Sequence, residues 1–123
     1  MGQEAAIEAL ERGEQSMLSM RREYELRRNY IVRGFNELGL ECFKPRGAFY
    51  VFPKITSTGL TSREFSLQLL REKKVAVVPG TAFGSSGEGH VRCSYATGLD
   101  QIKVALERIG AFCSQLNASK AAA

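Results

Sequence analysis

Apolar positions in the first third of the chain recur at intervals of three and four, the spacing of one face of a helix. Strong helix formers dominate from Glu4 to about Gly39. Ile31 and Phe35 mark the apolar side late in this run. Gly13 interrupts the run, so the pattern predicts a short helix followed by a long one. Gly39 is expected to end the long helix, because glycine tolerates the left-handed backbone that often follows a helix.

Short apolar and aromatic segments after this region have the composition of β-strands. Residues 40–43 and 48–52 flank a turn-prone Lys-Pro-Arg-Gly sequence and predict a hairpin-like pair of strands. Residues 75–78 predict a buried strand that Pro79-Gly80 ends. The alternating segment 90–96 predicts a further strand, because successive side chains point to opposite faces of a sheet.

Two further helices are expected between and after these strands. Thr61 or Ser62 is expected to cap a helix that ends near Lys73, and Glu64 is placed for a capping box. Residues 99–116 have the amphipathic pattern of a closing helix.

The order helix, strand, strand, helix, strand, strand, helix predicts an α+β fold: a two-layer sandwich in which helices cover one face of a small mixed sheet. The 123 residues, 44% of them hydrophobic, suit one compact domain. We expect residues 1–12 to be an interdomain helical segment, residues 13–116 the domain itself, and residues 117–123 a disordered tail with nothing to bury.

The formal charge of +4 raises the question of nucleic-acid binding. The basic residues of the long predicted helix are interleaved with glutamates, which indicates a solvated face rather than a binding stripe. Several aromatic residues fall in the apolar strand patterns instead of forming a stacking surface. The sequence therefore disfavours a nucleic-acid partner.

The apolar runs and the cysteines indicate which environment the chain is expected to occupy. No run approaches the roughly 18 residues needed to cross a bilayer, so no membrane partner is expected. Cys42, Cys93 and Cys113 stand apart from one another, and none belongs to a Cys-x-x-Cys pair that could bind zinc. This pattern is typical of reduced, buried thiols in an intracellular protein. The compartment stays open, because any targeting peptide would lie upstream.

Arg92 is the residue whose position most suggests chemistry. It lies between Val91 and Cys93 in a predicted strand, so it shares a face with His90 and Ser94. An arginine at such a position either forms a structural ion pair or binds an anion. Its planar fork can hold a carboxylate through two parallel hydrogen bonds, which a lysine cannot match.

Two other features of this region have simpler interpretations. The segment 84–89, Gly-Ser-Ser-Gly-Glu-Gly, lacks the lysine and the helix entry of a phosphate loop, and the carboxylate of Glu88 opposes an anion. It is expected to be a mobile connection between strands. His90, the single histidine, has no partner at metal or catalytic spacing and is expected to be a strand-edge residue. No metal site and no catalytic residue is predicted.

Three segments occur in a distinctive order: PRGAFYVFP at 45–53, VAVVPGTAFG at 75–84 and GHVRCSYA at 89–96. Together they resemble the consecutive blocks of the class I and II aminotransferases of fold type I, and most closely those of the aspartate-aminotransferase type. The similarity runs from about Gln3 to Phe112. It implies that the chain is the C-terminal small domain of such an enzyme.

The resemblance also implies roles for two residues. The arginine at the position of Arg92 binds the substrate's α-carboxylate in this family, and Phe49 is implied to face the substrate. The implied reaction transfers an amino group between an amino acid and a 2-oxo acid, with pyridoxal 5'-phosphate as cofactor. The implied partners are a large domain of the same chain and a second copy, since family members are homodimers.

The departure from the family is that the lysine block that binds the cofactor is absent. None of the chain's lysines matches it; they are Lys44, Lys54, Lys73, Lys74, Lys103 and Lys120. We therefore expect pyridoxal phosphate to belong to the intact enzyme only and the isolated chain to be inactive. Two alternatives stay open: a stand-alone α/β module that binds a small anion as a regulatory ligand, and a degenerate homologue kept for protein interaction.

Overall fold

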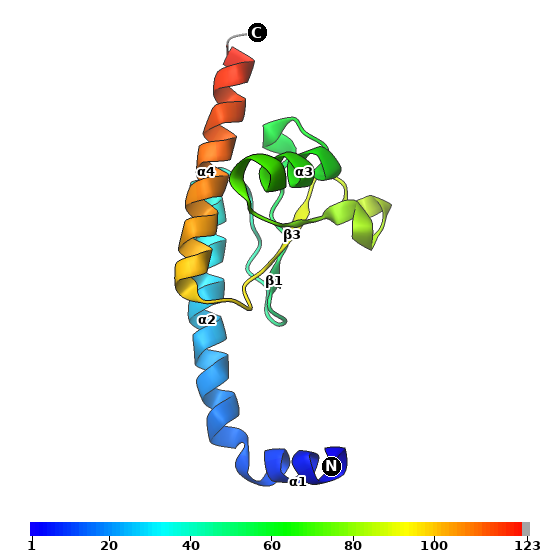
Figure 1. Ribbon diagram of the computed structural model, residues 1–123, viewed down its shortest axis with the longest axis vertical. Coiled ribbons are helices and arrows are strands. Elements are labelled where there is room, and N and C mark those ends of the chain that lie inside the picture. The colour runs from blue at the N-terminus through cyan, green and yellow to red at the C-terminus, as the bar shows by residue number, and fades with distance from the viewer. Residues whose placement is uncertain (122–123) are drawn as a thin grey trace.

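The computed structural model describes residues 1–121, which form helices and a small sheet joined by short 3₁₀ turns (Figure 1). The helices are α1 (Gly2–Arg12), α2 (Glu14–Glu37), α3 (Ser62–Lys73) and α4 (Leu99–Ala121). The strands are β1 (Tyr50–Val51), β2 (Val78–Pro79) and β3 (Val91–Ser94). The 3₁₀ turns are η1 (Thr56–Thr58), η2 (Gly80–Phe83) and η3 (Ser85–Gly87). The predicted α+β class is confirmed.

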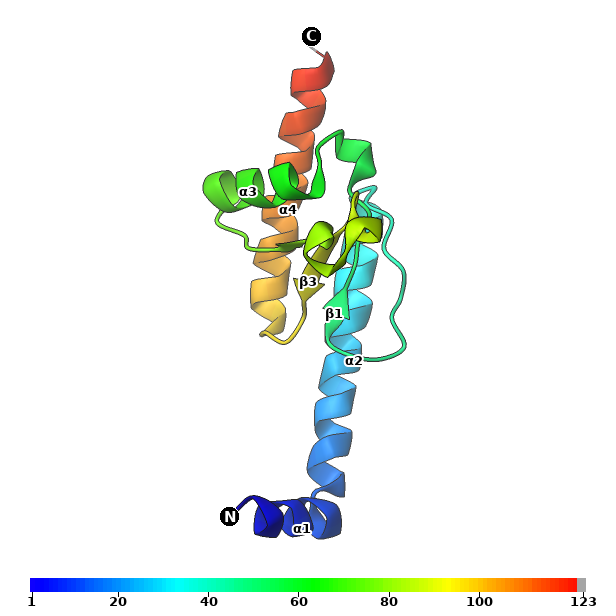
Figure 2. The ribbon, with the colours of Figure 1, turned by 90° about the vertical axis from the view of Figure 1, so that its right-hand side faces the viewer.

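Helices α1 and α2 follow the predicted pattern. Gly13 separates them, and Gly39 adopts a φ of 74° just after α2, as expected of a residue that ends a helix. Helix α1 buries no side chain, and with the first half of α2 it projects from the body of the molecule (Figures 1 and 2). The second half of α2 supplies the buried core residues Ile31 and Phe35, and Tyr24 packs against the core from nearer the middle of the helix.

The sheet has the strand order β1-β3-β2, and both pairings are antiparallel, so the prediction of a mixed sheet is wrong in this detail. The predicted hairpin between residues 40–43 and 48–52 is also wrong: residues 40–43 form no strand, and β1 pairs with β3. The side chain of Asn36 hydrogen-bonds to the backbone of Cys42 in this region. Its oxygen accepts from the Cys42 N–H at 3.1 Å, and its nitrogen donates to the Cys42 carbonyl at 3.0 Å. The end of α2 thus satisfies backbone groups that a strand partner would otherwise satisfy.

Alternation along β3 separates the core from the exposed face of the sheet. Val91, Cys93 and Tyr95 are buried, whereas Arg92 is half-buried and Ser94 is exposed. Helices α2 and α4 run side by side over the buried face (Figure 2). The predicted cover of helices on one face of the sheet is therefore confirmed, and the opposite face stays open.

Helix α3 begins with the predicted capping box. Thr61 Oγ1 accepts from the Glu64 N–H at 3.3 Å, and the Thr61 N–H donates to the Glu64 carboxylate at 2.9 Å. The helix packs against α4, where the Phe65 and Phe112 rings meet edge to face with centroids 5.4 Å apart.

Helix α4 extends beyond its predicted end at residue 116 and reaches Ala121, so residues 117–121 are helical instead of a tail. Residues 122–123 of the expected tail lie outside the described part of the chain. The extension is rich in alanine, a strong helix former, and the Lys120 ammonium donates to the Ser57 carbonyl at 3.2 Å.

All three thiols are unpaired and buried, as predicted. Burial raises the pKa of Cys42 to about 11, and it also raises the pKa of Cys93 and of Cys113. None of the helices described within residues 1–121 combines the length and apolar character needed to span a bilayer.

Candidate functional site

Arg92 occupies the open face of the central strand of the sheet. It lies opposite Val78 of β2 in the antiparallel register, and the neighbouring residue Cys93 lies opposite Val51 of β1. Strand β3 is therefore paired on both sides, and this pairing fixes the backbone that carries the guanidinium. This placement agrees with the strand position predicted for Arg92.

Two aromatic rings lie close to the guanidinium of Arg92. The Cζ atom is 4.4 Å from the centroid of the Tyr50 ring and 4.6 Å from the centroid of the Phe83 ring. Both distances are in the range of favourable cation–π contacts. Tyr50 belongs to β1 and Phe83 to the η2 turn, so segments 33 residues apart in sequence meet at this side chain.

Arg92 has no anionic partner among the described residues. Among residues 1–121 it forms no ion pair and donates no side-chain hydrogen bond. The sequence left two alternatives open for Arg92, a structural ion pair or the binding of an anion. The ion pair is not found in this part of the chain. The guanidinium keeps its planar array of N–H donors available for a carboxylate.

The η2–η3 segment, here residues 80–88, carries Phe83 and is fastened to helix α3 through Glu88. The Glu88 carboxylate accepts hydrogen bonds from the Ser62 N–H at 2.8 Å, the Ser62 hydroxyl at 3.0 Å and the Gly89 N–H at 2.9 Å. These hydrogen bonds lower the pKa of Glu88. Residues 84–89 were predicted to be a mobile connection between strands; they contain the 3₁₀ turn η3, and Glu88 ties them to the N-terminus of α3.

Gly80 and Gly87 allow this segment to fold back on itself. A Cβ atom on Gly80 would collide with the carbonyl oxygen of Gly87, and a Cβ on Gly87 would collide with that of Gly80. Glycine is therefore required at both positions for the two turns to touch. The positions of η2 and η3 then determine where the Phe83 ring lies.

His90 lies at the edge of the same face. Its ring stacks on Phe52 with centroids 5.4 Å apart and planes 10° apart, and Phe52 meets Phe83 edge to face at 6.2 Å. The residue forms an isolated bridge with Lys54 beside the sheet, in agreement with the predicted strand-edge position. No cluster of three possible metal-ligating side chains occurs among residues 1–121.

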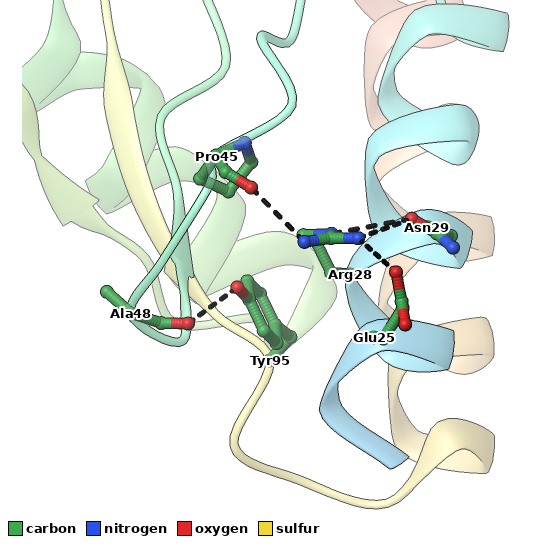
Figure 3. A network of polar contacts seen from close by, with 6 residues as sticks. All are labelled: Glu25, Arg28, Asn29, Pro45, Ala48 and Tyr95. Atoms are coloured by element: carbon green, nitrogen blue, oxygen red, sulfur yellow. Dashed lines mark hydrogen bonds and ion pairs between the residues drawn. The ribbon is translucent and has the colours of Figure 1, made fainter. Parts of the chain in front are cut away.

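Phe49, the second residue implied to face the substrate, is not one of the two rings in cation–π contact with Arg92. Its ring lies 4.3 Å from that of Tyr50, and Tyr50 in turn contacts the guanidinium. Phe49 follows Ala48, whose φ of 60° is unusual for a residue with a side chain. The Tyr95 hydroxyl donates to the Ala48 carbonyl at 2.8 Å and holds this turn in place (Figure 3).

The sequence interpretation found Arg92 but missed the rings of Tyr50 and Phe83 beside it, and it missed Glu88, which ties the segment that carries Phe83 to α3. Tyr50 lies two positions before Phe52 on the same alternating strand, so a correct register for β1 and β3 would have placed it near Arg92. Phe83 and Glu88 carried no comparable signal, because their positions depend on how the η2–η3 segment folds.

The lysines of the described chain do not fit a cofactor that must form a Schiff base. Five of the six are exposed and Lys73 is half-buried, whereas such a lysine needs an enclosed site. Lys54 and Lys103 form ion pairs with Glu41 and Asp100 at 3.8 and 3.5 Å. The residues present thus do not provide the attachment site for pyridoxal phosphate.

Comparisons with known proteins agree with this architecture. The family model described as "Aminotransferase class I and II" matches residues 1–109. The chain is 53% identical over 109 residues to aromatic-amino-acid aminotransferase 2 of Thermococcus litoralis, and 52% identical over 109 residues to aspartate aminotransferase of Pyrococcus abyssi. Each alignment covers 87% of this chain and 28% of the relative.

A solved structure gives the same result. The aromatic aminotransferase of Pyrococcus horikoshii OT3 superposes with a TM-score of 0.81 at 48% sequence identity, over 82% of this chain and 27% of that one. The fold is therefore one that occurs as a part of larger aminotransferase chains. This chain belongs to the class I and II aminotransferases, a pyridoxal-phosphate-dependent family, and its relatives include the aspartate type that the sequence resembles.

The chain spans less than a third of the relatives it matches. About seven-tenths of each relative therefore lies outside the aligned part. The missing attachment site for the cofactor is consistent with this partial coverage.

Proposed function

We propose that this chain is the substrate-recognition part, C-terminal in position, of a longer pyridoxal-phosphate-dependent aminotransferase. In this proposal Arg92 binds the α-carboxylate of an amino acid or a 2-oxo acid, and the intact enzyme is a homodimer. The observation that carries the proposal is a half-buried arginine held between Tyr50 and Phe83 with no carboxylate partner among the described residues.

The geometry around Arg92 supports binding of a carboxylate in one orientation. Rings stacked near the guanidinium limit its rotation, so little further ordering is needed when two parallel hydrogen bonds form. A substrate anchored in this way has its Cα at a fixed distance from the strand. Such orientation is a large part of what a recognition domain contributes to catalysis.

The proposal assigns the cofactor and its lysine to the rest of the polypeptide. The relatives are about three and a half times as long as the matched part, which leaves room for that site. The chain's own residues then bind and orient the substrate and help to exclude water when the two parts close on each other.

The test of Arg92 uses the intact polypeptide that contains this chain. Arg92→Gln should lower kcat/KM for amino-group transfer by about 100-fold, or about 2.8 kcal/mol, because a charge-assisted carboxylate pair is lost. Arg63→Gln is the matched control, since Arg63 is an exposed arginine on α3 that forms no ion pair in residues 1–121. An unchanged kcat/KM for Arg92→Gln would contradict the proposal.

A second experiment tests the assignment of the cofactor. The purified chain is mixed with pyridoxal phosphate, reduced with borohydride and mapped by mass spectrometry, with an amino-donor assay in parallel. The proposal expects no single stoichiometric lysine adduct and no turnover. One fully labelled lysine accompanied by turnover would show that the chain is catalytically complete and that the proposal is wrong.

A further inference from the structure

A second basic feature lies away from Arg92, where the middle of α2 faces the turn that precedes β1 (Figure 3). The open pocket there has a volume of about 540 Å³. Arg21 and Arg28 reach it from two turns of the same helix face, and Arg46 reaches it from the turn. Three guanidinium groups from two separate segments thus line one pocket.

Only one of these three charges is compensated within the described chain. Arg28 pairs with Glu25 at 2.9 Å and donates to the Pro45 carbonyl at 3.5 Å, and its side chain is 17% exposed. Arg28 therefore serves to attach the turn to the helix. Arg21 and Arg46 form no ion pair in residues 1–121, so the pocket keeps an excess of positive charge.

The turn adds backbone donors to this positive charge. Within residues 1–121, the N–H groups of Gly47 and Ala48 donate to no acceptor. The Ala48 carbonyl, in contrast, is occupied by the Tyr95 hydroxyl (Figure 3). A Cβ atom on Gly47 would meet nothing within 4 Å, so the space beside these amides is open. Unpaired amides beside a concave turn are a common feature of anion sites.

Aromatic side chains form the rest of the wall. Tyr24 lies at the centre, with its ring centroid 6.3 Å from that of Phe49 and 6.2 Å from that of Tyr95. Phe49 is 41% exposed, so its ring is available to a ligand. Rings at these separations favour offset or edge-to-face contact with a further planar group.

We propose that this pocket binds an aromatic acid, with its carboxylate or phosphate group on Arg21, Arg46 and the Gly47–Ala48 amides and its ring against Phe49 and Tyr24. The site uses different cations from those of the proposed substrate site at Arg92. Phe49, which the family resemblance implies to face the substrate, is common to the two sites, but the cations are not. Anion binding at this pocket and carboxylate binding at Arg92 can therefore each fail without the other.

The experiment titrates the 123-residue chain with phenyl phosphate, benzoate and inorganic phosphate while amide resonances are followed by NMR. Saturable shifts are expected at Gly47 and Ala48 with phenyl phosphate or benzoate, and weaker binding with inorganic phosphate, which has no ring. A preference between the first two identifies the acid group. Arg46→Gln and Arg21→Gln should each weaken binding at least about tenfold.

Arg22→Gln is the matched control, because it removes the same charge from an exposed position of α2 outside the pocket. The Arg22→Gln chain should bind phenyl phosphate and benzoate with the same affinity as the unaltered chain. Three results would overturn the proposal: shifts that do not saturate, shifts centred on Arg92 instead of the turn, or equal weakening by Arg22→Gln and Arg46→Gln. The last result would indicate attraction by overall charge only.

Discussion

Glu88 caps the N-terminus of helix α3 from a segment 26 residues away, through hydrogen bonds from both the N–H and the hydroxyl of Ser62. A carboxylate at this place also interacts favourably with the positive end of the helix dipole. Because Phe83 lies on the same η2–η3 segment as Glu88, the contact links helix α3 to the surroundings of Arg92.

Glu88→Gln should lower the melting temperature at pH 7, because the neutral amide loses the charge-assisted hydrogen bonds. The pKa of Glu88 is lowered in the folded chain, so its stabilising effect is complete above the ordinary value of 4.5 and is lost as the pH falls below it. The difference in melting temperature between the two chains, followed by circular dichroism, should therefore shrink toward pH 3. A difference that stays constant from pH 7 to pH 3 would contradict this assignment.

Thr61→Ala should destabilise the chain by about 1 kcal/mol, because it removes the side-chain acceptor of the capping box. Urea unfolding of the two chains gives this difference. Ser114→Ala serves as the control, since Ser114 is exposed on α4. Equal unfolding free energies for the two variants would show that the cap contributes nothing.

Gly80→Ala should destabilise the chain by about 1–3 kcal/mol or more, because the added Cβ meets the backbone of Gly87, which cannot move aside as a flexible side chain could. Gly98→Ala is the comparison, since a Cβ there meets nothing within 4 Å. Thermal unfolding of both variants tests the difference. Similar losses at the two positions would mean that the close approach of the two 3₁₀ turns is unimportant for stability.

Because the thiols are buried, the chain is expected to lose stability in alkaline solution. Burial raises the pKa of Cys42 from 9.0 to about 11, so stability is complete below pH 9 and is lost as the pH rises toward 11. Cys42→Ser should reduce the fall in unfolding free energy between pH 8 and pH 11, as measured by urea unfolding. An identical fall in both chains would show that Cys42 does not contribute to it.

Several features of this protein were determined by local sequence alone. The break at Gly13, the end of α2 before Gly39 and the capping box at Thr61 depend on residues within a few positions of one another, and all three were predicted correctly. The alternation around Arg92 was equally local, since it follows from the pleat of a single strand. Helix α4 ran past its predicted end because a polar, alanine-rich sequence can stay helical without burying a face.

The tertiary structure decided which segments meet. The sequence favoured a hairpin between neighbouring segments, but β1 paired with β3, and the backbone at Cys42 found its partner in the side chain of Asn36. The contact of the Tyr50 ring with Arg92 and the Glu88 cap on α3 likewise join segments more than twenty residues apart. Sequence periodicity reports which face a side chain takes and not which partner it finds, because partners are chosen by the packing of the whole core.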